Sequence, residues 1–365
     1  MKLKKLILKN YRNYEEEELE FNSGKNLIIG KNAQGKTNIL ESIYVLSTLK
    51  SQRTSNNTEL IKFNKENTEI FAVLEKNNAD IDLNYIYGFE KKRELKVNNL
   101  KTTTSNFKNI LKTVLFSTND LLLLRGVPQD RRDWLDRAIS QIYPLYDEKL
   151  SKYEKIRIQK NNLLKQDILN ENLLDVYNEQ MSITGSNVVF LRQKFLKEIE
   201  NISRQKHYKI SEGEKLEIKY VPTFKTSDSI EETAENFKKE LEENKKSEIL
   251  KRQSLIGPHR DDISFYINEN DAIKFASQGQ QRTVVLSLKI SELEMLKEKT
   301  GETPILLLDD VLAELDDLRQ NFLLNSIEKD TQTVITSVDT LLFDEEFLKD
   351  VKIFTVENGK IINTP

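Results

Sequence analysis

The feature that most constrains this sequence is the stretch from Gly30 to Asn38, which reads GKNAQGKTN. It fits the pattern G-x-x-x-x-G-K-[ST], the phosphate-binding loop of nucleoside triphosphatases. An apolar segment over residues 27–29 leads into the loop, and an apolar pattern with helical spacing follows it from Ile39. A strand before the loop and a helix after it are the setting in which this motif binds phosphate. The sequence therefore predicts a site for a nucleoside triphosphate. The alternative is a glycine turn that caps an ordinary helix.

Each type of residue in this loop has a predicted role. The glycines let the backbone wrap closely around phosphate, and the N–H groups that open the next helix point at the anion. Lys36 is predicted to bind the β- and γ-phosphates and to act in catalysis, and the Thr37 hydroxyl to ligate Mg²⁺. The predicted nucleotide-binding residues are Gly30, Lys31, Asn32, Ala33, Gln34, Gly35, Lys36, Thr37 and Asn38.

A second motif covers residues 305–310 and reads ILLLDD. An apolar strand that ends in a carboxylate is the Walker B pattern, in which the strand holds Asp309 beside Mg²⁺. Asp310 lies one position further, where a catalytic carboxylate can take a proton from the attacking water or orient it. An acidic turn after a buried strand is the alternative, which the phosphate loop upstream disfavours. The sequence predicts Asp309 as a metal ligand and Asp310 as a catalytic residue.

A third motif lies between the other two, over residues 275–282, and precedes a helix with an apolar face. Ser277 is a natural residue to start a helix, and Gly279 lets the backbone come close to an anion. Many helices open with Ser-x-Gly, so the motif alone is weak. Its order between the phosphate loop and the Walker B strand gives it weight.

Composition narrows the chemistry. Charged residues make up 32 % of the 365 residues, yet the net charge is −3, so any DNA surface must be a local basic patch. The absence of cysteine excludes disulfides and thiolate sites, and two histidines exclude a His-rich metal centre, whereas Mg²⁺ on oxygen ligands remains possible. Without a signal peptide or a membrane-spanning apolar run, we expect a soluble, cytoplasmic protein with no membrane partner.

The pattern along the chain predicts an α/β fold with an inserted helical part. Strand-like segments dominate to residue 120, a stripe of apolar residues over 174–202 predicts a long helix, and residues 229–253 read as one charged helix. A turn is expected at Asn98 and Asn99. We expect a head with mixed β-sheets formed by residues 1–120 and 254–365, and a helical arm formed by residues 121–253.

Taken together, these motifs carry a resemblance. Residues 277–281 resemble the signature loop of ABC-type ATPases, and Glu314, Leu315 and Asp316 resemble their D-loop. Within that class the whole chain resembles the RecF family, which is related to SMC proteins. The matching stretches are residues 8–14, 30–38, 115–117, 131–136, 256–262, 276–283 and 306–316.

The resemblance implies an ATPase head that uses ATP and Mg²⁺ and forms ATP-dependent homodimers. In such dimers the signature loop of one copy completes the other copy's site, so that Ser277 and Gly279 would contact the γ-phosphate bound at Lys36 of the partner subunit. The signature loop residues are Ser277, Gln278, Gly279, Gln280 and Gln281. Arg12, in the family's N-terminal motif, would approach the nucleotide, or it could pair with an acidic neighbour.

The resemblance also implies a cellular role. Family members bind single- and double-stranded DNA at gaps or junctions, hydrolyse ATP slowly with stimulation by DNA, and act in DNA repair, the SOS response and replication restart. They cooperate with RecR and RecO to load RecA. Candidate DNA contacts are basic residues, because phosphate binding needs Lys or Arg. They are Arg53, Arg131, Arg132, Arg192, Arg204 and Lys206, although the pattern favours a solvated surface charge or an ion-pair partner for each.

The chain departs from the family pattern at a few positions. Many ABC-type ATPases have Glu where this chain has Asp310, and the shorter side chain predicts slow turnover. Gln52 precedes Arg53 where a His-Arg pair is more usual, and its role stays open. No switch histidine follows the strand at residues 333–336, where Ser337 and Asp339 are candidates. Three other functions remain: a P-loop kinase acting on a small molecule, a structural nucleotide-binding module, and another SMC-like repair ATPase.

Overall fold

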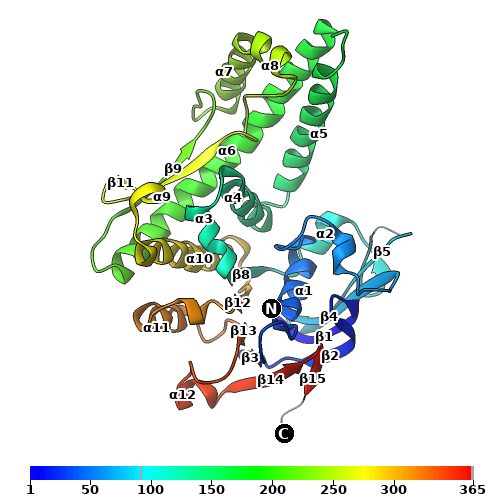
Figure 1. The fold of residues 1–365 in the computed structure, drawn as a ribbon, viewed down its shortest axis with the longest axis vertical. Coiled ribbons are helices and arrows are strands. Elements are labelled where there is room, and N and C mark those ends of the chain that lie inside the picture. Colours follow the sequence, from blue (N-terminus) through cyan, green and yellow to red (C-terminus); the bar gives the residue numbers. More distant parts are fainter. Residues whose placement is uncertain (91–92, 363–365) are drawn as a thin grey trace. The chain divides into compact units, whose positions relative to one another are not determined.

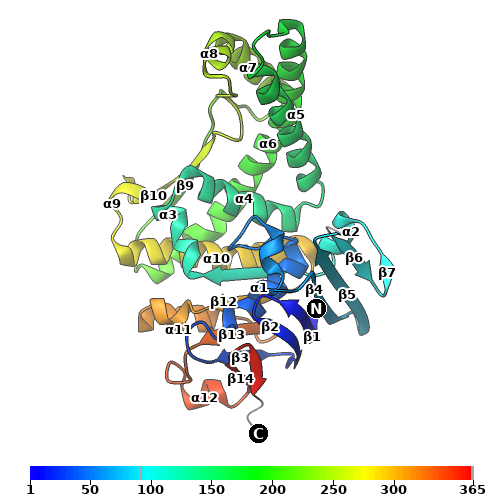
Figure 2. The ribbon, with the colours of Figure 1, turned by 45° about the vertical axis from the view of Figure 1, so that its right-hand side comes forward.

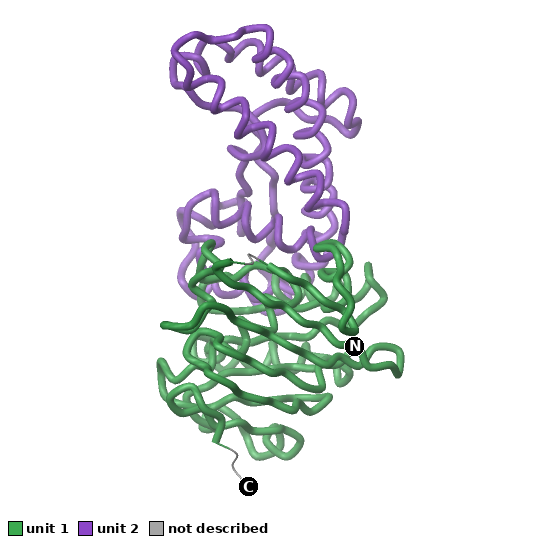
Figure 3. Tube along the Cα trace, turned by 90° about the vertical axis from the view of Figure 1, so that its right-hand side faces the viewer, with its two compact units in different colours: residues 1–120, 288–365 green, residues 121–287 purple. Residues whose placement is uncertain are grey.

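The structure, a computed structural model, describes residues 1–90 and 93–362 of the chain (Figure 1). The chain forms two compact units, one of residues 1–120 and 288–365 and one of residues 121–287 (Figure 3). We expected the head to resume at residue 254, whereas residues 254–287 belong to the second unit. The reason is strand pairing, because β10 (Asp262–Ile267) runs antiparallel to β9 (Leu216–Val221) inside that unit.

The first unit contains a six-stranded sheet in the order β15-β14-β3-β13-β12-β8. Its strands are parallel except for β15, so the carboxyl ends of β3, β13, β12 and β8 meet at one edge. Ligands of α/β sheets bind at that edge. The strands are β3 (Lys25–Ile29), β8 (Thr113–Ser117), β12 (Ile305–Asp309), β13 (Thr333–Ser337), β14 (Val351–Glu357) and β15 (Lys360–Ile362).

The same unit contains an antiparallel sheet in the order β2-β1-β4-β5-β6-β7. The expected turn at Asn98 and Asn99 is confirmed: both residues have left-handed φ angles, 48° and 64°, as a two-residue hairpin turn requires. The strands are β1 (Lys2–Tyr11), β2 (Tyr14–Glu20), β4 (Asn67–Lys76), β5 (Ala79–Gly88), β6 (Glu94–Val97) and β7 (Leu100–Lys101).

Helix α1 (Lys36–Thr48) joins the two sheets into one core. Its residues from Ile39 to Thr48 are all buried, and the apolar ones among them belong to a cluster that includes Leu6 of β1 and Leu307 of β12. Each such side chain contributes about 1.5–3 kcal/mol when it leaves water. The buried helix is therefore fixed between the sheets, and it carries the phosphate loop at its N-terminus.

Other helical segments connect these strands. They are η1 (Asn57–Leu60), α2 (Thr104–Lys108), η2 (Thr118–Leu121), η3 (Leu312–Glu314), α11 (Asp317–Ser326) and α12 (Glu345–Leu348), together with α10 (Gln278–Thr300), which starts in the second unit and ends in the first.

The second unit is mainly helical, and its longest element is α6 (Glu171–Ile210), which confirms the predicted long helix. Figures 1 and 2 show α5 (Tyr146–Leu164) beside it. The expected single helix over residues 229–253 is wrong, because Asn244 ends α7 (Ile230–Glu243) and its side-chain amide bonds the Glu240 carbonyl. The remaining elements are α3 (Leu122–Arg125), α4 (Pro128–Ile142), α8 (Lys245–Lys251), β11 (Asn270–Asp271) and α9 (Ala272–Phe275).

Among the described residues, no helix combines the length and the apolar character that crossing a membrane requires.

Candidate nucleotide site

The phosphate loop adopts a backbone that only glycine tolerates at two positions. Gly30 and Gly35 have φ angles of +155° and +122°. A Cβ atom on Gly30 would lie 2.4 Å from the Val356 carbonyl oxygen, and one on Gly35 would lie 2.7 Å from the Tyr14 hydroxyl. Both glycines are therefore fixed by close approach of neighbouring chain as well as by their φ angles.

Lys36 lies across this loop. Its side chain is buried, and Nζ donates to the Gly30 carbonyl at 2.7 Å and to the Lys31 carbonyl at 3.3 Å. The ammonium group is thus held inside the curve of the loop, where phosphate binds in such motifs.

The Walker B strand brings its carboxylate to the start of α1. Thr37 Oγ1 donates to Asp309 Oδ1 at 2.9 Å, and Thr336 Oγ1, from the neighbouring strand β13, donates to the same oxygen at 3.0 Å. Burial raises the pKa of Asp309, and the two hydroxyl hydrogen bonds oppose that rise. A desolvated carboxylate of this kind gains from a nearby cation.

Hydroxyl and carboxylate oxygens are the ligands that Mg²⁺ prefers, so Thr37 and Asp309 fit the predicted metal site. Across residues 1–90 and 93–362, no group of three or more acidic or histidine side chains is arranged to hold a metal ion by itself. A cation here would therefore depend on phosphate oxygens for its other ligands.

Asp310 has an unusual local geometry. Its φ angle is +51°, and its N–H donates to Thr336 Oγ1 at 2.8 Å. Its Oδ1 is buried without a hydrogen-bond partner among the described residues. Such an atom carries a desolvation cost, which a water molecule or a ligand can relieve. Asp310 thus offers a free acceptor beside Asp309.

A cavity of about 230 Å³ opens at this point of the first unit. Thr37, Asp309 and Asp310 line it together with Gln52 and Ser117, whose Oγ lies 3.4 Å from Gln52 Oε1. Gln52, whose role the sequence left open, therefore faces the same space as the Walker B carboxylates.

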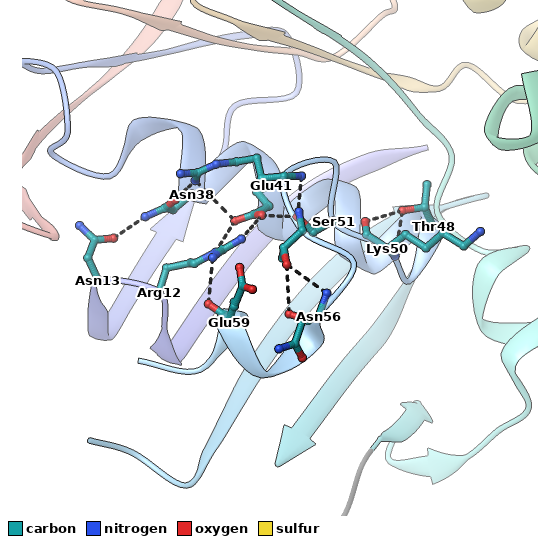
Figure 4. Close-up of polar contacts among 11 residues, drawn as sticks. Arg12, Asn13, Asn38, Glu41, Thr48, Lys50, Ser51, Asn56 and Glu59 are labelled. Carbon is teal, nitrogen blue, oxygen red and sulfur yellow. Dashed lines mark hydrogen bonds and ion pairs between the residues drawn. The ribbon is translucent and has the colours of Figure 1, made fainter. Parts of the chain in front are cut away.

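Arg12 forms an ion pair with Glu41 of α1 (Figure 4). Its Nε and Nη2 donate to the two Glu41 carboxylate oxygens at 2.8 and 2.6 Å, and Nη1 donates to the Glu59 carbonyl at 2.9 Å. Ser51 Oγ also donates to Glu41, at 2.5 Å. The structure shows the pairing of Arg12 with an acidic neighbour, and its approach to the nucleotide stays a prediction.

Arg53 lies at the cavity, although the sequence suggested a DNA contact. Its Nη1 donates to Asn38 Oδ1 at 2.7 Å and lies 3.9 Å from Glu41. Its positive charge acts to lower the pKa of Asp309, against the effect of burial. We therefore assign Arg53 to the surroundings of the nucleotide site.

The signature segment begins α10, in the second unit. Ser277 Oγ accepts from the Gln280 N–H at 3.2 Å, and Gln280 Oε1 accepts from the Ser277 N–H at 2.9 Å. This reciprocal pair is a capping box, so Ser277 starts the helix as expected. Gln280 also donates to Glu214 at 2.7 Å, and Gln281 accepts from Arg125 at 2.7 Å.

The D-loop residues surround the start of α11. Glu314 ends a 3₁₀ turn, Leu315 is buried, and Asp316 caps α11 by accepting from the Arg319 N–H at 3.0 Å. Of the two candidates for the switch position, Asp339 bonds the N–H of Leu341 within its own turn, at 2.9 Å. Ser337 ends β13 and is buried.

Two of the proposed DNA contacts are occupied inside the second unit. Arg131 makes two hydrogen bonds to Asp262, at 2.7 and 2.9 Å, and Arg192 makes two to Asp136, at 2.9 and 3.0 Å. Both guanidinium groups are buried. Because phosphate would have to displace these buried ion pairs, we do not retain Arg131 and Arg192 as DNA contacts.

The other candidates differ. Arg132 donates to the Asp261 carbonyl at 2.6 Å, and exposed Arg204 pairs with Glu200 at 2.7 Å. Lys206 lies two positions further along α6 and also has an interaction partner.

Comparisons with known proteins agree with this geometry. The family model described as the RecF/RecN/SMC N terminal domain matches residues 2–362. The chain is 42 % identical to the DNA replication and repair protein RecF of Staphylococcus haemolyticus (strain JCSC1435), over 99 % of this chain and 100 % of that protein. The chain belongs to the RecF family. It is also 43 % identical to the RecF protein of Streptococcus gordonii, over 99 % of this chain and 100 % of the relative.

Solved structures show the same fold. The structure of the recombination mediator protein RecF-ATP in the RecFOR pathway matches with a TM-score of 0.91 and 33 % identity, covering 100 % of this chain and 98 % of that chain. An SMC head bound to the C-winged helix domain of ScpA matches at 0.55 with 14 % identity, a likeness of fold alone. The predicted ABC-type, SMC-like fold of a RecF family member is confirmed.

Sequence reasoning missed some residues that shape the site. Glu41 follows Thr37 by one helical turn, and Thr336 lies one residue before the end of β13, the strand beside the Walker B strand. A signal existed for Thr336, because parallel neighbours of a Walker B strand end at the same edge. Nothing in the sequence distinguishes Glu41 from a surface carboxylate, because the tertiary fold brings its partner Arg12 to it.

Proposed function

We propose that this chain is an ATP-dependent DNA-binding protein of recombinational repair and replication restart. The observation that carries the proposal is the meeting of Thr37 and Asp309, 2.9 Å apart, at a cavity beside the phosphate loop. The relatives are named DNA replication and repair proteins, and a similar solved chain is described as a recombination mediator with ATP in the RecFOR pathway. These likenesses support ATP as the nucleotide.

The site residues would divide the work as follows. The phosphate loop and Lys36 bind the triphosphate, and Thr37 and Asp309 hold Mg²⁺, which neutralises charge on the phosphate oxygens. Asp310 presents its free Oδ1 to the attacking water and orients it. An aspartate reaches less far than a glutamate, so turnover is slow.

Dimerisation would come from the signature segment. Ser277 Oγ already accepts a hydrogen bond from the Gln280 N–H, but a hydroxyl also has a proton to donate. That proton can bind the γ-phosphate held at Lys36 of the partner subunit without loss of the helix cap. ATP then favours the closed dimer over ADP, and a few kcal/mol of differential binding suffice to shift the population.

DNA at gaps or junctions and the RecR and RecO proteins are the proposed partners. Arg132, Arg204 and Lys206 remain the candidate DNA contacts, since phosphate backbones require cationic side chains. Stimulation of the ATPase by DNA follows if DNA favours the closed dimer. The full-length match to RecF proteins supports this proposal over a small-molecule kinase or a structural nucleotide-binding module.

The test is the mass of the protein in solution, measured by light scattering with Mg²⁺ and either ATP or ADP. The proposal predicts a dimer with ATP and a monomer with ADP. Ser277→Arg places a bulky cation at the start of α10 and should abolish the dimer.

A matched control is Ser105→Arg, at an exposed serine of α2, which should still dimerise with ATP. A constant monomer, or a dimer indifferent to both nucleotide and Ser277→Arg, would contradict the proposal.

A further inference from the structure

The carbonyl groups of the phosphate loop are bound by two segments distant in sequence. The Gln34 carbonyl accepts from Asn13 Nδ2 at 2.9 Å and from the Gly359 N–H at 3.0 Å. The Gly35 carbonyl accepts from the Tyr14 hydroxyl at 3.0 Å. Asn13 and Tyr14 lie at the corner between β1 and β2, and Gly359 lies in the turn between β14 and β15.

These bonds decide where the N–H groups of the loop point. A peptide unit is planar and trans, so its carbonyl and its N–H point in opposite directions. When Asn13 and Gly359 hold the Gln34 carbonyl, they turn the Gly35 N–H to the opposite side. Tyr14 does the same for the Lys36 N–H by holding the Gly35 carbonyl. Those N–H groups are what a phosphate loop offers to its ligand.

The turn between β14 and β15 is shaped for this contact. Gly359 has a φ of +70°, and a Cβ atom on it would lie 2.8 Å from the Asn13 carbonyl oxygen and 2.9 Å from Asn13 Nδ2. The preceding residue, Asn358, donates its N–H to Gln34 Oε1 at 2.6 Å, across 324 positions of sequence. Figure 1 shows β15 next to β2, in agreement with the contacts of these strands.

We propose that the turn at Asn358 and Gly359, together with Asn13, positions the phosphate loop for nucleotide binding. The inference rests on the proposed binding of ATP. Backbone N–H groups of such a loop serve the phosphates that ATP and ADP share. A disturbed turn therefore lowers the affinities for ATP and for ADP by the same factor. The turnover rate at saturating ATP stays close to that of the parent.

The chain offers a closely matched pair of variants to test this. Gly301 has the same φ, +70°, as Gly359, but a Cβ atom on it meets nothing within 4 Å. Gly359→Ala and Gly301→Ala therefore impose the same backbone strain, and only the first disturbs Asn13. Calorimetric titration with Mg-ATP and with Mg-ADP should show about tenfold weaker binding for Gly359→Ala, the size of one good hydrogen bond, and binding within about twofold of the parent for Gly301→Ala.

Asn13→Ala provides a second route that keeps the turn intact. It removes the side-chain hydrogen bond to the Gln34 carbonyl and should lower the affinities for ATP and ADP by about fivefold. The melting temperature and the turnover rate at saturating ATP should change little. Combined with Gly359→Ala, the loss should be smaller than the product of the two, because both act on one carbonyl.

Equal nucleotide affinities for the folded Gly359→Ala and Gly301→Ala proteins would overturn the inference. So would a normal affinity for Asn13→Ala. If the parent protein itself bound no ATP, the proposed function would fail instead, which keeps the two failures apart.

Discussion

The nucleotide site in the first unit and the buried ion pairs in the second unit differ in how far their charged groups are paired. In the site, Asp310 Oδ1 has no partner among the described residues, and burial raises the pKa of Asp309. In the second unit, Arg192 bonds Asp136, the Tyr146 hydroxyl and the Pro258 carbonyl. Both regions include residues from stretches that resemble the RecF family, such as Asp310 in the site and Asp136 in the second unit. The difference shows that the site keeps an acceptor that a ligand or water can bind, whereas the charges of the second unit are paired with groups of the same unit.

The second unit contains further examples of satisfied charge. Lys160 and Glu248 form an ion pair at 2.6 Å with both side chains fully buried, and Glu248 also accepts from the Leu255 N–H. Such pairs contribute little net stability, but removal of one partner is costly because it leaves a buried charge alone. These residues therefore specify the arrangement of the helical unit.

The largest effect is expected from the removal of one arginine that forms a buried ion pair in the second unit. Arg192→Met should lower the free energy of unfolding by about 3–5 kcal/mol, because Asp136 would remain half-buried without its partner. Urea unfolding followed by circular dichroism measures the change. Arg204→Met is the matched control, since Arg204 lies on the same helix, is exposed and pairs with Glu200, and the change should cost less than about 1 kcal/mol. Equal effects of the two changes would contradict the distinction.

Removal of a charge from the nucleotide site should lower turnover and leave stability nearly unchanged. Lys36→Ala should reduce ATP turnover by about 100- to 1,000-fold, because the phosphates lose their main cationic contact. Its melting temperature should stay near that of the parent. Lys101→Ala, at an exposed lysine of β7, should change neither quantity. A large loss of stability without loss of turnover in Lys36→Ala would reverse the roles assigned to the two regions.

A pH titration sharpens the account of the second unit. Burial lowers the pKa of His259 from 6.5 to about 3, and the neutral ring lies 2.6 Å from the Tyr153 hydroxyl. The unfolded chain takes up a proton near pH 6.5 and the folded chain does not, so acidification from there costs about 1.4 kcal/mol per pH unit.

The fall in stability between about pH 6 and pH 4 should therefore be shallower in His259→Gln than in the parent, by that slope. Unfolding by urea at several pH values measures it. Parallel pH profiles for the two proteins would show that His259 is not held neutral by the fold.

The smallest expected effect concerns the free carboxylate of the site. Asp310→Glu should raise turnover by about twofold or more, because the longer side chain reaches the attacking water better. Phosphate release in the steady state measures it, with Asp310→Asn as the variant that should be slower than the parent. If the glutamate variant is no faster than the parent, the length of the side chain at position 310 is not the reason for slow turnover.

The sequence alone predicted what local patterns determine. The phosphate loop, the Walker B strand, the Ser277 helix start and the long helix all follow from spacing within a few turns or strands. Contacts set by the tertiary fold could not be read in this way. The pair of Arg12 with Glu41 and the bond of Asn358 to Gln34 join segments whose approach depends on strand order and register.

The same reason explains why Arg131 and Arg192 are not DNA contacts in this account. Whether an arginine is solvated or buried depends on the partner that the fold brings to it, as Asp262 is brought to Arg131 by β10. A basic residue in a family-like stretch therefore says little about DNA until its neighbours are known.

The most direct test is a structure of the protein with Mg²⁺ and a non-hydrolysable ATP analogue. The γ-phosphate should lie within hydrogen-bond distance of Lys36 Nζ and of Ser277 from the partner subunit, with the cation between Thr37 and Asp309. A γ-phosphate that faces only solvent, in a single copy of the chain, would contradict the proposed nucleotide-gated dimer.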